Sequence, residues 1–212
     1  MSDLMKVGPD WGGLGSFKPF TSGVSGAQRT NDAHGRFLDA VLGNRAFFLP
    51  VAAAAPTAYV GAAGGSPLLA VHNPANSAKL LVGMMVGVTG RAAASAAGQT
   101  GLNVWSGPSV TPTGTQTNPT NALSLAKSGS AMMGFINTAL TGSTALAMAL
   151  PLFTYYWATA AGAIMAPGQF DLGGLIVAAP GNQVAIGFSV APTSFTADAG
   201  FWWEEIPLLP QG

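Results

Sequence analysis

Histidine, cysteine and paired acids are the side chains that most often bind metals or catalyse reactions, and this 212-residue chain has few of them. Its two histidines, His34 and His72, belong to no HxH, HExxH or HxxxH pattern that would place two metal ligands together. We therefore expect structural roles for both, with His72 capping or hydrogen bonding beside a turn. The absence of cysteine excludes disulfides, thiolate catalysis and thiolate metal sites.

Patterns for nucleophiles, nucleotides and acid pairs are also incomplete. The stretch GVSG at residues 23–26 fails the GxSxG pattern at its fifth position, and Lys18 occupies the third glycine position of a GxGxxG motif. Glu204 and Glu205 are adjacent on a predicted strand, so their side chains should point to opposite faces. The sequence thus predicts a protein that is not an enzyme, with no catalytic residue, no cofactor and no metal site.

The scarcity of charge is the most unusual feature of the composition. Only 8% of residues are charged, where an ordinary soluble domain has about 25%. The net charge is zero and no basic run occurs, which argues against nucleic-acid binding. Such a chain has little electrostatic solubility by itself. We therefore expect much of its surface to be covered by copies or partners.

The least polar tract, residues 131–167, is long enough to suggest a membrane span. Asn137, Thr138 and Pro151 interrupt it, and no Lys/Arg cluster flanks it, so the sequence predicts no membrane partner. The N-terminus lacks the apolar run of a secretory signal, so we expect synthesis in the cytoplasm without export.

Glycine and proline punctuate the chain from Pro50 onward, which favours short strands over long helices. In "GNQVAIGFSVAP", Val184, Ile186 and Phe188 alternate with other residues and predict one apolar face. The segment "NPANSA" predicts a turn between two strands, and residues 106–121 predict a long exposed loop. The predicted strands are Ala46–Val51, Pro67–Val71, Lys79–Thr89, Gly101–Trp105, Ala131–Asn137, Leu152–Thr159, Gly174–Ala178, Gln183–Val190 and Gly200–Ile206.

These patterns divide the chain into three parts. Residues 1–24, rich in glycine and aromatics but without a period, predict an extended arm whose aromatics dock on another surface, such as a neighbouring subunit. Residues 25–44 predict an amphipathic helix with a capping box at Ser25 and a left-handed stop at Gly43-Asn44. Residues 45–212 predict an antiparallel β-sandwich of the jelly-roll type.

Three segments, "AQRTNDAHGRFLDAVLGNRAFFL", "LLAVHNPANSAKLLVGMMVG" and "GFWWEEIP", resemble virion structural proteins of tailed bacteriophages. Among these, a jelly-roll capsid decoration or cement protein is the best match. The resemblance implies a homotrimer on the capsid surface of the virion that binds the major capsid protein. The candidate interface residues are Trp11, Phe17, Phe20, Phe37, Trp202 and Trp203.

Other functional interpretations of the sequence remain open. One is a tail or fibre module for host recognition, in which the loop at 107–121 binds a glycan and Trp105 and Asn103 contribute to the site. Another is a small β-sandwich capsid or neck protein, and a third is a membrane-active β-protein.

Overall fold

The computed structural model describes residues 21–22, 28–29, 37–92, 98–157, 168–190 and 195–208. These belong to two compact units. One unit holds residues 1–36 and 209–212, and its described part is a two-stranded pairing of β1 (Thr21–Ser22) with β2 (Gln28–Arg29). The other unit, Phe37–Leu208, is called the body below.

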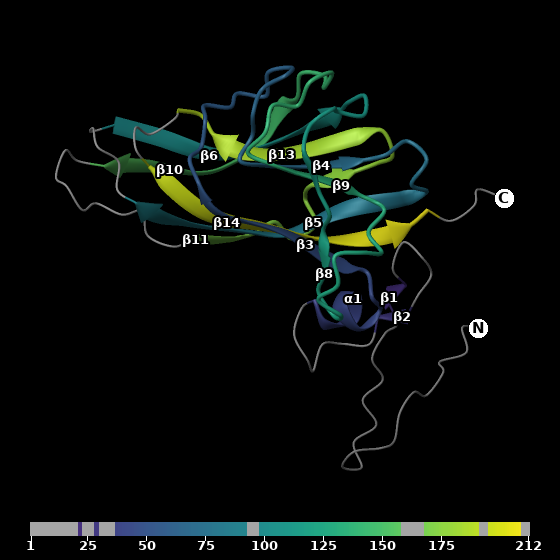
Figure 1. Ribbon diagram of the computed structural model, residues 1–212. Coiled ribbons are helices and arrows are strands. Elements are labelled where there is room, and N and C mark those ends of the chain that lie inside the picture. The colour runs from purple at the N-terminus through teal and green to yellow at the C-terminus, as the bar shows by residue number, and fades with distance from the viewer. Residues whose placement is uncertain are drawn as a thin grey trace, which may run out of the picture. The chain divides into compact units, whose positions relative to one another are not determined.

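The body consists of two layers of antiparallel strands (Figure 1). The β13 sheet has the order β10 (Ala147–Trp157), β6 (Gly98–Pro108), β13 (Asn182–Phe188), β4 (Leu69–Asn73), β9 (Met133–Ile136), β7 (Gln116–Thr117). The β14 sheet has the order β11 (Gly168–Asp171), β5 (Lys79–Ala92), β14 (Thr196–Pro207), β3 (Ala46–Ala54), β8 (Thr120–Asn121), and β12 (Val177–Ala178) also pairs with β5. The predicted antiparallel β-sandwich is therefore confirmed.

The chain passes repeatedly from one sheet to the other. β3 lies in the β14 sheet, β4 in the β13 sheet, β5 in the β14 sheet and β6 in the β13 sheet, and β13 and β14 again lie in different sheets. Consecutive strands therefore often lie in opposite sheets of the sandwich. The turn at "NPANSA" accordingly joins two strands that face each other across the core.

Apolar side chains of both sheets meet between the layers. Val184, Ile186 and Phe188 point inward from β13, as their alternation predicted, and each is almost fully buried. From the β14 sheet, Trp203 stacks on Phe47 and Phe201, with ring centroids 6.4 and 5.4 Å apart. Alternation with period two thus gives each central strand one face for this core.

The predicted strands coincide with β3, β4, β5, β6, β9, β10, β13 and β14, with shifted ends. The predicted strand Gly174–Ala178 is wrong in its first half, because Gly173 and Gly174 have positive φ angles of 57° and 79° and form a turn. The exposed loop predicted at 106–121 is wrong at Thr120 and Asn121, which are buried in β8 beside β3. Local polarity does not reveal such long-range pairing.

The helix predicted over residues 25–44 is also corrected. The described helix, α1 (Leu38–Leu42), has five residues, and Gln28–Arg29 form a strand instead. Residues 25–27 and 30–36 lie outside the described residues. At Gln28 and Arg29, antiparallel pairing with Thr21–Ser22 takes the place of the predicted helix. The predicted stop is confirmed, because Gly43 caps α1 and Asn44 has a φ of 58°.

No helix among the described residues is long and apolar enough to cross a membrane.

Candidate functional site

An apolar pocket lies on the outer face of the β14 sheet, between that sheet and α1. Its volume is about 220 Å³, and no charged side chain lines it. On this face Trp202 stacks on Phe48 with ring centroids 6.1 Å apart and stands opposite Met85 of β5. The lining residues are Phe37, Val41, Ala46, Phe47, Met84, Met85, Ala122 and Trp202.

A β-bulge and small side chains shape this pocket. The register of β5 against β14 shifts at Trp202–Trp203, which leaves Met84 as an extra residue of β5. A bulge re-aims a side chain, and Met84 is buried in the cluster that α1 covers. α1 contributes Ala40 to this cluster, β3 contributes Ala46, and Ala122 forms part of the pocket wall. Because alanines fill little volume, a helix of five residues leaves a hollow above the sheet.

An ionic network lies beside the pocket. Arg45 donates from Nε to Glu204 Oε1 at 2.8 Å and from Nη2 to Asp39 Oδ2 at 3.1 Å. The hydrogen bond with Glu204 is the largest of the interactions that raise the pKa of Arg45 above its usual value. Glu204 stands opposite Ala46 in the β3–β14 register, so this network adjoins the pocket and ties α1 to the sheet. The Asp39 side chain is 87% exposed, so its pair with Arg45 contributes little to stability.

Three leucines extend the apolar character beyond the pocket. Leu42 follows Val41 in the sequence and is 62% exposed, while Leu123 and Leu125 follow Ala122 and are 49% and 70% exposed. The Oδ1 atom of Asn121 accepts hydrogen bonds from the backbone N–H groups of Leu123 and Ser124, both at 3.0 Å, and thereby orders this loop. We call the pocket lining together with Leu42, Leu123 and Leu125 the α1 surface.

The structure separates the candidate interface residues. It brings Phe37 and Trp202 together in the wall of the pocket, where both are partly exposed. Trp203 is a correction, because its side chain is fully buried in the core and has no surface to offer a partner. Trp11, Phe17 and Phe20 lie outside the described residues.

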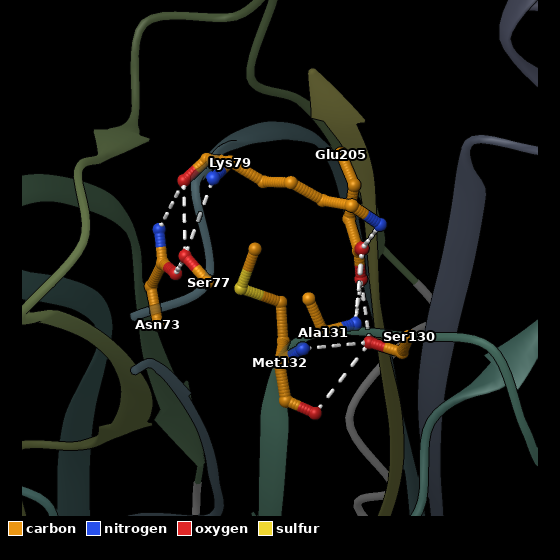
Figure 2. A network of polar contacts seen from close by, with 7 residues as sticks. All are labelled: Asn73, Ser77, Lys79, Ser130, Ala131, Met132 and Glu205. Carbon is orange, nitrogen blue, oxygen red and sulfur yellow. Dashed lines mark hydrogen bonds and ion pairs between the residues drawn. The ribbon is translucent and has the colours of Figure 1, made fainter. Parts of the chain in front are cut away.

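Glu205 occupies the opposite face of β14 from Glu204, as the strand geometry predicted, and its carboxylate is buried at one end of the core. Figure 2 shows Lys79, Ser130 and Ala131 converging on it. Lys79 Nζ lies 2.8 Å from Oε2, the backbone N–H of Ala131 donates at 3.1 Å to the same oxygen, and the Ser130 hydroxyl donates to Oε1. Both carboxylate oxygens are therefore satisfied by donors, which a buried charge requires.

Asn73 continues this polar network into the turn between β4 and β5. Its Nδ2 atom donates to the backbone carbonyls of Lys79 at 2.8 Å and Ala178 at 2.9 Å, and its Oδ1 atom accepts from the Ser77 hydroxyl (Figure 2). The amide thus joins segments from both sheets at this end of the sandwich. Its chemistry is structural, because each polar atom holds a backbone or side-chain partner in place.

His72 lies in a different environment on the outer face of the β13 sheet. It stands opposite Gln183 on β13 and Met133 on β9, and both His72 and Gln183 are buried. Neither ring nitrogen of His72 has a hydrogen-bond partner in the part of the chain that the structure describes. The predicted capping role is therefore wrong, and Asn73 next to it caps the turn. Burial lowers the pKa of the His72 imidazole below its usual value.

Loops cover this outer face over β4, β6, β9 and β13. Tyr59 and Trp105 form an edge-to-face pair with ring centroids 5.0 Å apart, and burial raises the pKa of Tyr59 to about 12. Phe135 and Leu140 complete a buried cluster with them. Trp105 and Asn103 are 3% and 7% exposed, so the glycan contact suggested for these two residues is wrong.

Among the described residues, no group of three or more His, Cys, Asp or Glu side chains is placed to hold a metal ion. Comparison of the chain with protein-family models, curated proteins and solved structures finds no match.

Proposed function

We propose that this protein is a non-enzymatic structural subunit that works through protein–protein contacts, and specifically a decoration or cement protein of a bacteriophage head. Its partners would be copies of itself and the major capsid protein. The observation that carries the proposal is the way the body uses its few charges, because nearly all of them pair within the chain.

The body contains nine charged side chains, and seven of them form ion pairs with one another. Arg45 pairs with Asp39 and Glu204, Lys79 with Glu205, and Arg91 with Asp198. Asp171 accepts a hydrogen bond at Oδ1 from the backbone N–H of Gly173 at 2.8 Å, and Lys127 is the ninth charged side chain. A surface with so few uncommitted charges can be covered by a neighbour without the penalty of desolvating unpaired ions.

The exposed apolar residues lend further support. The α1 surface has an apolar pocket and three exposed leucines that follow lining residues in the sequence, and exposed aliphatic and aromatic side chains are typical of contact sites between proteins. The Glu205 and Asn73 network links both sheets at one end of the sandwich. A body held in one shape in this way suits a role in which many copies add contacts across a lattice.

The proposal is tested on particles of the phage that encodes the chain. Antibodies raised against the purified protein are gold-labelled and applied to intact particles for electron microscopy. We expect label spread over the head, with a copy number per particle by mass spectrometry that is a multiple of the capsomer symmetry. Label confined to the tail would favour host recognition, and particles without label would contradict the proposal.

A further inference from the structure

We propose that the pocket of the α1 surface receives a phenylalanine ring from the segment Phe17–Phe20 of a second copy of this chain. The inference deepens the proposed function and rests on it, since it names the contact through which copies would join. It combines the geometry of the pocket with the sequence of a segment that the structure does not describe.

The pocket has the size and the chemistry to hold an aromatic ring. A cavity of about 150 Å³ lined by Leu, Ile and Phe is large enough to bind benzene, and this pocket has about 220 Å³. Its walls offer the rings of Phe37 and Trp202 and the thioethers of Met84 and Met85. Aromatic rings and methionine sulfurs both interact favourably with an inserted aromatic ring. A phenylalanine side chain therefore matches the pocket in volume and in polarity.

The side chains beside the pocket and the segment Phe17–Phe20 carry opposite charges. Asp39, Arg45 and Glu204 beside the pocket carry one positive and two negative charges, which leaves a net charge of −1 there. The Asp39 side chain is 87% exposed. In the segment "FKPF", Lys18 stands between Phe17 and Phe20, so an inserted ring would bring a cation to this acidic rim. Pro19 restricts the backbone and lowers the entropy lost when the segment is ordered.

The length of chain between the segment and Phe37 allows the segment to come from a neighbouring copy. All aromatic residues of the first 36 positions lie between Trp11 and Phe20. Because β1 and β2 pair, residues 21–29 fold back and add only about 5 Å to the reach of the segment. The eight steps from Arg29 to Phe37 add at most about 29 Å, so Phe20 can lie up to about 38 Å from Phe37 in the pocket wall. This distance reaches the pocket of a neighbouring copy that packs against the α1 surface. A neighbour could also cover Leu42, Leu123 and Leu125, which are 62%, 49% and 70% exposed. Because each copy has one segment and one pocket, the exchange can close a ring of identical subunits.

Photo-cross-linking of the full-length protein tests this inference. Phe17 is replaced by p-benzoylphenylalanine in unlabelled copies, which are refolded together with ¹⁵N-labelled copies of the original chain. After irradiation, trypsin releases the peptide Leu80–Arg91, which contains Met84 and Met85. We expect adducts between unlabelled residue 17 and the ¹⁵N form of this peptide. Adducts only within one chain, adducts only outside the pocket, or no adduct would each overturn the proposal.

Variants of the pocket and its rim give the controls. Ala122→Phe fills the pocket, so we expect the adduct to fall at least tenfold and the sedimentation coefficient to shift toward the monomer. Ala75→Phe adds the same ring at an exposed position of the β4–β5 turn and should leave both unchanged. Lys18→Glu in the unlabelled copies should reduce the adduct severalfold, and Asp39→Lys in the ¹⁵N-labelled copies should restore it. An undiminished adduct in Ala122→Phe, with circular dichroism unchanged, would contradict the proposal.

The cross-link and the particle experiment fail separately. Adducts in the purified protein together with unlabelled phage heads would contradict only the cement function. Labelled heads without a cross-link at the pocket would contradict only the exchange of segments between copies.

Discussion

The outer faces of the two sheets are covered in different ways. The outer face of the β13 sheet is filled by Tyr59, Trp105 and Phe135 and sealed by residues 55–68 and 137–146, which hydrogen-bond to each other. The outer face of the β14 sheet has a five-residue helix over small alanines and keeps a hollow of about 220 Å³. One face is thus completed within the chain, whereas the other keeps a hollow beside α1.

Close contacts confirm that the first face is full. A Cβ atom added at Gly61 would lie 2.3 Å from the carbonyl oxygen of Leu146 and 2.7 Å from a ring atom of Trp105. A Cβ atom added at Gly187 would lie 3.1 Å from the Cβ of Tyr59. These glycines let the covering loops approach the sheet more closely than any other residue allows.

Truncating one tryptophan on each face should give the largest difference in stability between the two faces. Trp105→Ala should lower the free energy of unfolding by about 3–5 kcal/mol, because a buried ring is lost from a sealed cluster. Trp202→Ala should lower it by only about 1–2 kcal/mol, since this side chain is partly exposed beside an existing hollow. Urea unfolding of both variants at 25 °C measures the two losses. Equal losses would mean that the faces are packed alike.

Adding a methyl group at either of two glycines in a covering loop tests how tightly that loop packs on the sheet. Gly61→Ala should cost about 3 kcal/mol, because φ is 76° and the new Cβ meets both backbone and a buried ring. Gly64 in the same loop has a φ of 70°, but an added Cβ finds no atom within 4 Å. Gly64→Ala should therefore cost only about 1 kcal/mol. Thermal and urea unfolding of the pair separate steric overlap from backbone strain, and a cost at Gly64 as large as that at Gly61 would refute the sealed packing.

Enlarging an alanine on each face should give effects of opposite sign. Ala185 is fully buried beneath the loops, so Ala185→Leu should destabilise the fold by about 1–3 kcal/mol through overpacking. Ala122 lines the hollow, so Ala122→Leu should be neutral or stabilise by up to about 1 kcal/mol. The unfolding midpoint in urea measures both changes. A clear loss of stability in Ala122→Leu would show that the hollow is not accessible to an added side chain.

The inward faces were predictable from the sequence, whereas the outer faces were not. The alternation of Val184, Ile186 and Phe188 correctly assigned the core face of β13. The same pattern placed Gln183 and Ala185 on the opposite face, and both are nevertheless buried. The residues that cover them come from loops without any period, and periodicity reports only the strand on which it occurs. The path of a covering loop is a long-range property.

The candidate site was predictable in part for the same reason. The adjacency of Glu204 and Glu205 on a strand implied that one carboxylate faces inward. Its partner Lys79 is 126 residues away in the sequence, so no local window connects them. Phe37 and Trp202 were each predicted as contact residues from their type. Their common pocket depends on a β-bulge and on the shortness of α1, and neither leaves a recognisable mark in the sequence.

The smallest expected effect concerns His72, which, like the facing Gln183, is buried on this face without a hydrogen-bond partner among the described residues. Burial lowers the pKa of this imidazole in the folded state, whereas the unfolded chain has a histidine pKa of about 6.5. Between these values the unfolded state binds more protons, so this group makes the protein less stable as the pH falls below about 6.5. The stability that this group loses at low pH is fully present above about pH 6.5.

Replacing the imidazole by a side chain of similar volume should therefore remove a pH dependence without harming the fold. We expect His72→Leu to change the free energy of unfolding by less than about 1 kcal/mol at pH 7, because an apolar replacement for an unsatisfied polar group is close to neutral. Between pH 7 and pH 5, this variant should lose less stability than the original chain. Gln183→Leu, which changes the facing residue but titrates nothing, should keep the original slope. An unchanged slope in His72→Leu would show that the folded protein admits a proton to this site as readily as the unfolded chain does.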